Sequence, residues 1–420
     1  LRCGAPMTDL RDPQGVHGNT PSASQTIPVN AGRLRVAISA IFLANGMAAG
    51  LWAVMVPVLM ANLAISESEM GIILLVGGIS AVGNLLLSGK LISMFGARPV
   101  ILVSAIIIAA ALPMMPMVAS TLPAAAAVVV FIAGLALMDV AMNAEAADAE
   151  NASTRSMMSG FHAFWSLGAM AGAAAGGFVV AKLGAATGAT GTAGIVLAVC
   201  SVAILSLPRR KITESTSASI SAEHVWFPRN PIVWLTGFVA FAAFVSEGSV
   251  LDWSAHYLRK TLSADVAISG LAFGAFSLSM VIARFAGDWM RETFGDRRLM
   301  IASILISAFG LITASLSPTP VIAMAGFLLA GFGNANLVPI AFSTASNIKG
   351  VPAGAGIATA TMCGYSGVLA APATLGWIGE HAGMSWIFMT MGILIASLLF
   401  AVPAMGRASR QAGRRRTVEA

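Results

Sequence analysis

Two carboxylates, Glu247 and Asp252, stand inside an apolar stretch that runs from Phe241 to Leu258. An ionisable side chain at bilayer depth costs roughly 2.5 to 3.5 kcal/mol on insertion scales, so it usually faces a cavity or a partner and marks an ion or solute path. Five residues on a helix turn through about 140°, so the two carboxylates cannot form a side-by-side pair. We expect Glu247 to carry a proton or contact a solute, with a packing hydrogen bond as the alternative. We expect Asp252 to act at a gate or interface.

Asp139 and Asn143 form a second polar pair inside an apolar run. Because they are one helical turn apart, they lie on one face of the helix. One interpretation is that they bind a solute or a proton. The other is that Asp139 is the partner of Lys90 or Arg98 and holds a gate closed.

His162 is the histidine that lies well inside an apolar run, and Trp165 and Ser166 share its helical face. A neutral imidazole can move protons near neutral pH, which makes His162 a further candidate for proton coupling. A packing role is the alternative. The other histidines, His256 among them, fall in expected tails or loops. No clustered Cys/His set predicts a metal site.

Uncharged polar residues suggest contacts to a solute. Asn45 and Trp52 are seven residues apart and share a stripe, and Asn336 follows Asn334 in a later apolar run. Amides and indoles suit hydroxylated ligands, so we predict solute contacts at Asn45, Trp52, Asn143, Trp165, Asn336 and Tyr365. Any of these side chains can instead bridge two helices, where such bonds contribute about 0.6 kcal/mol each.

The composition excludes an ordinary soluble domain. Of 420 residues, 57% are hydrophobic and only 10% are charged, whereas soluble domains usually carry about 25% charged residues. About 20 apolar residues cross a bilayer as a helix, and this measure predicts an all-α membrane protein with twelve transmembrane helices. The predicted spans are 34–60, 69–89, 99–119, 122–144, 157–181, 188–207, 231–257, 265–288, 299–316, 320–345, 353–378 and 384–405.

Charge distribution predicts the orientation. With both termini cytoplasmic, 20 of the 24 Lys and Arg residues fall in inner segments and three fall in outer loops, with Arg284 inside a span. This bias follows the positive-inside rule. Arg284 and Asp288 have the spacing of an ion pair on one helix, for which we expect a structural role.

The sequence pattern indicates that the second half of the chain is a duplicate of the first. A shift of 199 residues places six glycines of the first half on glycines of the second, among them Gly96 on Gly295 and Gly184 on Gly383. We therefore predict two pseudo-symmetric six-helix halves, as in many transporters. The predicted segments are a disordered tail at 1–32, a half at 33–207, a cytoplasmic linker at 208–230, a half at 231–405 and a basic tail at 406–420.

The same shift aligns Phe95-Gly96-Ala97-Arg98 with Phe294-Gly295-Asp296-Arg297. In this loop the chain resembles the major facilitator superfamily, whose signature there is G-x-L-x-D-R-x-G-R-R. Ser93 replaces the acid of the first half, and Glu292 supplies it in the second. The resemblance implies the major facilitator fold, alternating access, a monomer, and gate or structural charges at Arg98 and Glu292.

Four short stretches resemble a bacterial subgroup of that superfamily. They begin at Asp139, Ser159, Glu247 and Gly364. The subgroup includes a membrane protein implicated in the transport of rhizopine, an inositol-derived amine, by rhizobia. The resemblance implies that the helices corresponding to spans one, four, seven and ten line the solute cavity.

A glycine run from Gly168 to Gly177 resembles the fifth-helix motif of proton-coupled drug antiporters, except that Ala173 replaces its proline. Close helix packing is the alternative interpretation. No nucleophile elbow or nucleotide-binding loop is present, so we expect no enzyme, no cofactor and no ATP coupling. The basic tail predicts contact with anionic lipid and not with nucleic acid.

We therefore predict a secondary transporter in a bacterial inner membrane that moves a polyol, a sugar or an inositol-derived amine with protons. A drug antiporter is the first alternative. A transporter-like sensor that binds solute without carrying it is the second.

Overall fold

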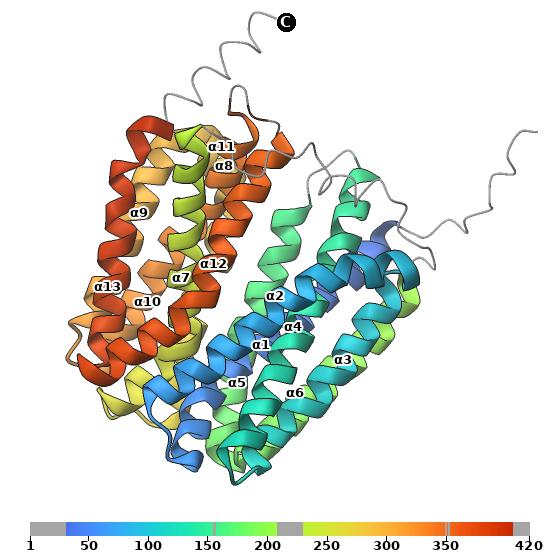
Figure 1. The fold of residues 1–420 in the computed structure, drawn as a ribbon, viewed down its shortest axis with the longest axis vertical. Helices are drawn as coiled ribbons and strands as arrows, with labels where there is room; N and C mark the ends of the chain where they lie inside the picture. Colours follow the sequence, from blue (N-terminus) through green and yellow to red (C-terminus); the bar gives the residue numbers. More distant parts are fainter. Residues whose placement is uncertain (1–30, 154–156, 208–229, 349–350, 352, 406–420) are drawn as a thin grey trace, which may run out of the picture.

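The computed structural model describes residues 31–153, 157–207, 230–348, 351 and 353–405, and in these ranges the regular structure is helical (Figure 1). The α-helices are α1 (Ala31–Leu63), α2 (Glu67–Phe95), α3 (Ala97–Met114), α4 (Thr121–Asn151), α5 (Met158–Leu183), α6 (Ala185–Ala203), α7 (Pro231–Lys260), α8 (Val266–Phe294), α9 (Asp296–Ser315), α10 (Pro320–Asn334), α11 (Leu337–Ser346), α12 (Ala353–His381) and α13 (Met384–Ser397). Single 3-10 turns, η1 (Met115–Met117), η2 (Ile204–Ser206) and η4 (Leu398–Phe400), extend α3, α6 and α13.

Ten helical segments of the described chain are long and apolar enough to cross a membrane, or up to 11 if the bent α2 is one span. α12 is a further helix of 29 residues that packs along α7 and α2. The prediction of an all-α, multi-pass membrane fold is confirmed. The count of twelve spans stays a prediction.

The tenth predicted span is one apolar segment, Pro320–Ser346, that a short turn divides into two helices. α10 ends at Asn334 and α11 begins at Leu337, with the turn at Ala335 and Asn336 between them. Pro339 explains the break, because its ring clashes with the carbonyl four residues earlier, that of Ala335, and it has no N–H to donate.

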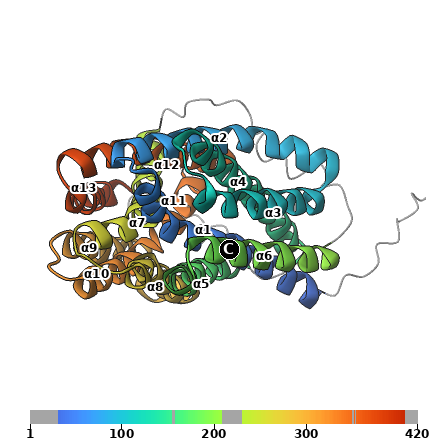
Figure 2. The same ribbon diagram turned by 90° about the horizontal axis from the view of Figure 1, so that it is seen from below.

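The helices form two similar groups, which Figure 2 shows side by side. In the first group α1 packs on α5, α4 packs on α2 and α3, and α3 packs on α6. The second group repeats these contacts as α7 with α12, α10 with α8 and α9, and α9 with α13. The groups meet along α5 with α8 and along α2 with α12, which are also equivalent pairs. The predicted pseudo-symmetry is therefore confirmed.

The duplication is also seen in the backbone conformation of four tight turns between helices. Gly96 and Gly295 have φ of 83° and 75°, and Gly184 and Gly383 have φ of 87° and 100°. Residues with a side chain rarely adopt such angles, so glycine suits each helix-to-helix junction. Both pairs are among the six that the 199-residue shift superimposes. The predicted segment boundaries stay predictions, and residues 1–30, 208–229 and 406–420 lie outside the described chain.

α1 and α5 approach each other through their backbones. A Cβ atom on Gly46, Gly50 or Gly168 would lie 2.0 Å from a carbonyl oxygen of the other helix, and one on Gly172 would lie 2.1 Å from Met47 O. Small residues allow this contact, which replaces the hydrophobic effect as the source of helix association in lipid. Most of the glycine run that resembles the antiporter motif is thus accounted for by packing.

We expect Gly172→Ala to destabilise the protein by about 1–3 kcal/mol, because the added methyl must push two backbones apart. Thermal unfolding in detergent measures the effect, which should appear as a lower midpoint temperature than that of wild type. Gly191→Ala is the matched control, because no atom lies within 4 Å of its Cβ position and alanine favours a helix. Equal midpoints for the two variants would contradict the packing argument.

Candidate functional site

Arg284 of α8 contacts polar groups of two other helices, α5 and α7. Its Nη2 lies 3.8 Å from Glu247 Oε2 of α7. Its Nη1 donates to Ser166 Oγ of α5 at 2.5 Å and to the His162 carbonyl at 3.4 Å. The Arg284 and Glu247 side chains are 16% and 19% exposed. A charge at this depth needs a partner, so each of the two stabilises the charged form of the other.

His162 contacts this cluster through its backbone carbonyl, while its ring meets Phe42 edge-on with centroids 5.3 Å apart. Ser166 Oγ also donates to the His162 carbonyl at 3.2 Å. The predicted proton-coupling residues Glu247 and His162 therefore lie on either side of Arg284.

Asp252 joins the two groups of helices. Trp52 Nε1 of α1 donates to Asp252 Oδ1 of α7 at 3.1 Å. The indole is 3% exposed and packs on Phe131, with ring centroids 5.7 Å apart. Glu247 and Asp252 have different partners, as their angular separation on α7 requires.

Asp139 is engaged within α4. Asn143 Nδ2 donates to the Asp139 carbonyl at 2.8 Å and to its Oδ1 at 3.2 Å. The carboxylate also interacts electrostatically with Tyr365 of α12, whose ring lies 5.9 Å from Phe244. The predicted solute contacts Asn143 and Tyr365 thus belong to different groups of helices, Asn143 to α4 and Tyr365 to α12.

Asn45 ties three helices of the first group. Its Oδ1 accepts from Trp165 Nε1 at 2.9 Å, and its Nδ2 donates to the Leu135 carbonyl at 3.2 Å. The amide therefore has one donor and its acceptor engaged by protein. Asn45 is brought together with Trp165 of α5, whereas Trp52, on the same helix as Asn45, faces Asp252.

The break between α10 and α11 holds two buried amides. Asn334 Nδ2 donates to the Ala243 carbonyl of α7 at 3.2 Å. Asn336 is 3% exposed, and its Oδ1 would lie 3.1 Å from a Cβ atom on Gly287 of α8. Asn336 therefore packs against α8, and within the described chain no hydrogen bond links it to Asn45 or Tyr365.

The remaining predicted charges lie away from the Arg284 cluster. Arg98 is in the first turn of α3, and Glu292 is exposed in the last turn of α8. The Asp288 side chain lies outside the described part of the structure, so its expected pairing with Arg284 stays a prediction.

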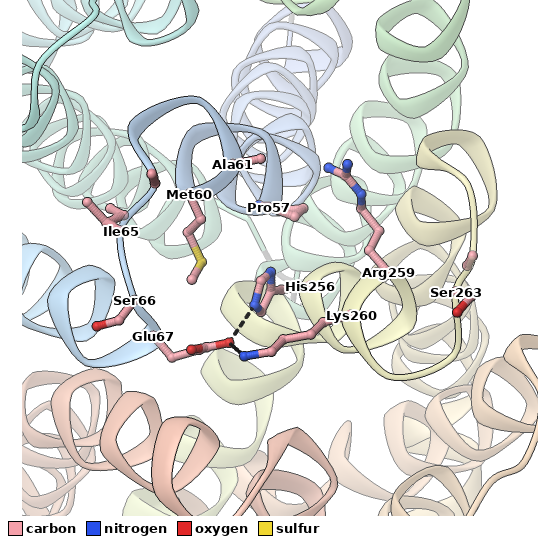
Figure 3. Close-up of a pocket in the computed structure, with 12 residues that line it drawn as sticks. Pro57, Met60, Ala61, Ile65, Ser66, Glu67, His256, Arg259, Lys260 and Ser263 are labelled. Carbon is pink, nitrogen blue, oxygen red and sulfur yellow. Dashed lines mark hydrogen bonds and ion pairs between the residues drawn. The ribbon is translucent and has the colours of Figure 1, made fainter.

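A second polar cluster was not predicted from the sequence. Glu67 is the first residue of α2. Its Oε1 forms ion pairs with His256 Nε2 at 2.9 Å and with Lys260 Nζ, both from α7 (Figure 3). The expectation that His256 lies in a loop is wrong, because α7 continues to Lys260. The spacing of Asp252, His256 and Lys260, four residues each, is a signal that could have found this face of α7.

These three residues line a cavity of about 720 Å³ at the end of the molecule where α1 meets α2 and α7 meets α8. We call this end the Glu67 end. The cavity wall also includes Pro57, Met60 and Arg259. It is separate from the Arg284 cluster, so the chain holds two polar sites at different depths.

Comparison with known proteins places this geometry in context. A family model for the Major Facilitator Superfamily matches residues 37–262 and 233–419. An uncharacterized MFS-type transporter of Yersinia pestis is 33% identical over 88% of this chain and 94% of its own length. The membrane protein MosC of Rhizobium meliloti is 28% identical over 91% of each chain.

Solved transporters share the fold at low identity. A crystal structure of the nucleoside transporter NupG superimposes with a TM-score of 0.65 at 16% identity, covering 89% of this chain and 98% of NupG. The fucose:proton symporter FucP of E. coli gives a TM-score of 0.57 at 15% identity, with 88% of this chain and 98% of FucP covered.

We expect the Arg284–Glu247 pair to show energetic coupling in a double-mutant cycle. Removing one partner leaves the other charge buried without compensation, so Arg284→Met and Glu247→Gln should each destabilise the protein. The double variant should be more stable than the sum of the two effects predicts, by at least about 1 kcal/mol. The free energy of unfolding in detergent measures it.

The control for this cycle pairs Glu247→Gln with Arg98→Met, which lies in another part of the fold. The effects of these two changes on the free energy of unfolding should add within about 0.5 kcal/mol. Additivity of Arg284→Met and Glu247→Gln as well would show that the two side chains do not interact.

Proposed function

This chain belongs to the Major Facilitator Superfamily, and from that membership we propose that it is a secondary transporter that couples a small polar solute to protons. Its relatives are named as transporters, so the expectation of a transporter and not an enzyme is confirmed. The solute class, the coupling ion and the residues that bind them are the finer part of the proposal.

The observation that carries the proposal is the buried Arg284–Glu247 pair. Arg284 donates to α5 of the first group, while Glu247 belongs to α7 of the second. A proton that binds Glu247 removes the negative charge facing Arg284, and the guanidinium then needs another partner. Because a buried charge without compensation is costly, protonation changes the relative energy of arrangements that differ in the contacts of α5, α7 and α8.

We propose a polyol, a sugar or an inositol-derived amine as the solute. The amides of Asn143 and Asn336 carry donors and acceptors for hydroxyl groups, whereas the Trp165 indole, whose N–H is donated to Asn45, offers its ring for stacking. Carboxylates at Asp139 and Asp252 suit an amine. Two solved transporters of the same fold are named for small polar solutes, nucleosides and fucose, which supports this choice.

The topology completes the proposal. We place the chain as a monomer in a bacterial inner membrane with both termini cytoplasmic, because Lys and Arg are concentrated in the segments that this orientation keeps inside. The Glu67 end then faces away from the cytoplasm, where a polar cluster joins the two groups of helices.

The test is solute uptake into proteoliposomes with an imposed pH gradient, using inositol-type amines and sugars. Wild type should accumulate a solute. Glu247→Gln should reduce gradient-driven accumulation at least about tenfold, whereas exchange of solute without a gradient continues, because exchange needs no net proton movement.

Glu69→Gln is the matched control. Glu69 is exposed, and glutamine can keep the capping box that Glu69 forms with Ser66. Accumulation by Glu247→Gln at the wild-type level would contradict coupling at Glu247 and direct the search to Asp139 and His162. A wild type that carries none of these solutes but expels cationic dyes would support the antiporter alternative.

A further inference from the structure

The Glu67 cluster joins the two groups of helices at one end of the molecule. The Glu67 carboxylate is 5% exposed and has two donors, His256 and Lys260, whose side chains are 13% and 52% exposed. Both donors belong to α7 of the second group, whereas Glu67 begins α2 of the first (Figure 3). One carboxylate thus holds two helices that belong to different groups.

Neighbouring contacts close the same end. The Ser68 amide donates to Glu380 Oε2 of α12 at 3.0 Å. A Cβ atom on Gly376 of α12 would lie 2.4 Å from the Glu67 carbonyl oxygen. The start of α2 therefore rests directly on the backbone of α12, and no solute can pass between these helices in this arrangement.

α7 meets the first group along a single stripe at this end. Asp252, His256 and Lys260 are spaced four residues apart, and they contact Trp52, Glu67 and Glu67 respectively. Residues at this spacing lie on one helical face. The seam is therefore made of polar pairs from Asp252 outward, with the 720 Å³ cavity beside the outermost pair.

We infer that Glu67 is the gate residue of this end, the group whose bonds to His256 and Lys260 must break before a solute can pass between α2 and α7. This inference rests on the proposed alternating-access transport. It assigns to transport a residue that acts outside the central site, and it makes the cavity the mouth from which a solute enters or leaves.

The chemistry of the contact suits a gate that opens and closes repeatedly. Buried ion pairs lose nearly as much in desolvation as they gain in attraction. When the gate opens, Glu67 and Lys260 become hydrated beside an existing cavity, which offsets the lost contact. An apolar seal of similar area would favour the closed arrangement more strongly, because its opening would expose apolar surface to water.

Hydrogen exchange with mass spectrometry tests this inference without a solute or a gradient. The reporter peptides cover 53–63 at the end of α1 and 253–260 at the end of α7. Glu67→Gln should raise amide exchange in both peptides by about tenfold, and Glu67→Lys by more, because it brings three basic groups together. The charge exchange Glu67→Lys with Lys260→Glu should restore protection.

Glu69→Gln, two residues further along α2, is the control and should exchange like wild type. Unchanged exchange in Glu67→Gln would overturn the inference. So would a rise in all peptides, including those of α3 and α9, because that pattern indicates general destabilisation. A rise that the charge exchange fails to reverse would also overturn it, since volume and not charge would then be the cause. If Glu67→Lys does not fold, Glu67→Gln and Glu67→Asp test the inference instead. The amide exchange rate of Glu67→Asp in the two reporter peptides should then lie between those of Glu67→Gln and wild type.

The result is independent of the proposed solute and coupling ion. A failure of uptake in proteoliposomes would leave the exchange pattern unaffected. Conversely, proton-driven uptake can hold while another residue forms the gate.

Discussion

The cost of placing a charge in hydrocarbon governs this molecule. In lipid the helices satisfy their own backbone groups, so polar side chains must find partners within their own helix or on a neighbouring one. Here the buried charges lie where the two groups of helices meet. Arg284 contacts α5, Asp252 contacts α1, and Glu67 contacts α7. These contacts between helices are a consequence of that cost, whereas Asp139 finds its partner Asn143 one turn along its own helix.

Close backbone contact through glycine occurs both within a group and where the groups meet, as at Gly376 against the Glu67 carbonyl. α1 and α5 contact each other backbone to backbone at Gly46, Gly50, Gly168 and Gly172, and Gly310 and Gly326 bring α9 and α10 equally close. Such contacts fit only one relative placement of two helices and are lost by a shift of a few tenths of an ångström. Polar pairs between the groups differ from these contacts, because a polar side chain can exchange its partner for water or solute.

Much of this could be predicted from the sequence, because it depends on local properties. Apolar run length predicts the helices, and the repeated glycines predict the duplicated turns at Gly96 and Gly295. The pair Trp52–Asp252 joins residues 200 positions apart, and Glu67 meets Lys260 across 193. Sequence periodicity cannot predict such contacts, since they depend on how the two groups of helices dock. The break at Ala335 was missed because a proline near the end of an apolar run is compatible with a kink or with two helices.

α7 connects the two polar sites, because it carries Glu247 near its middle and Lys260 at its end. Thirteen residues separate them, or about 20 Å along a helix. α7 is an uninterrupted helix from Pro231 to Lys260, so a tilt at Glu247 is transmitted to the contacts of His256 and Lys260. In the proposed mechanism, a proton that weakens the Arg284 pair would therefore act on the helix that also carries the donors to Glu67. Such coupling would need no chain of intermediates, since one helix takes part in both sites.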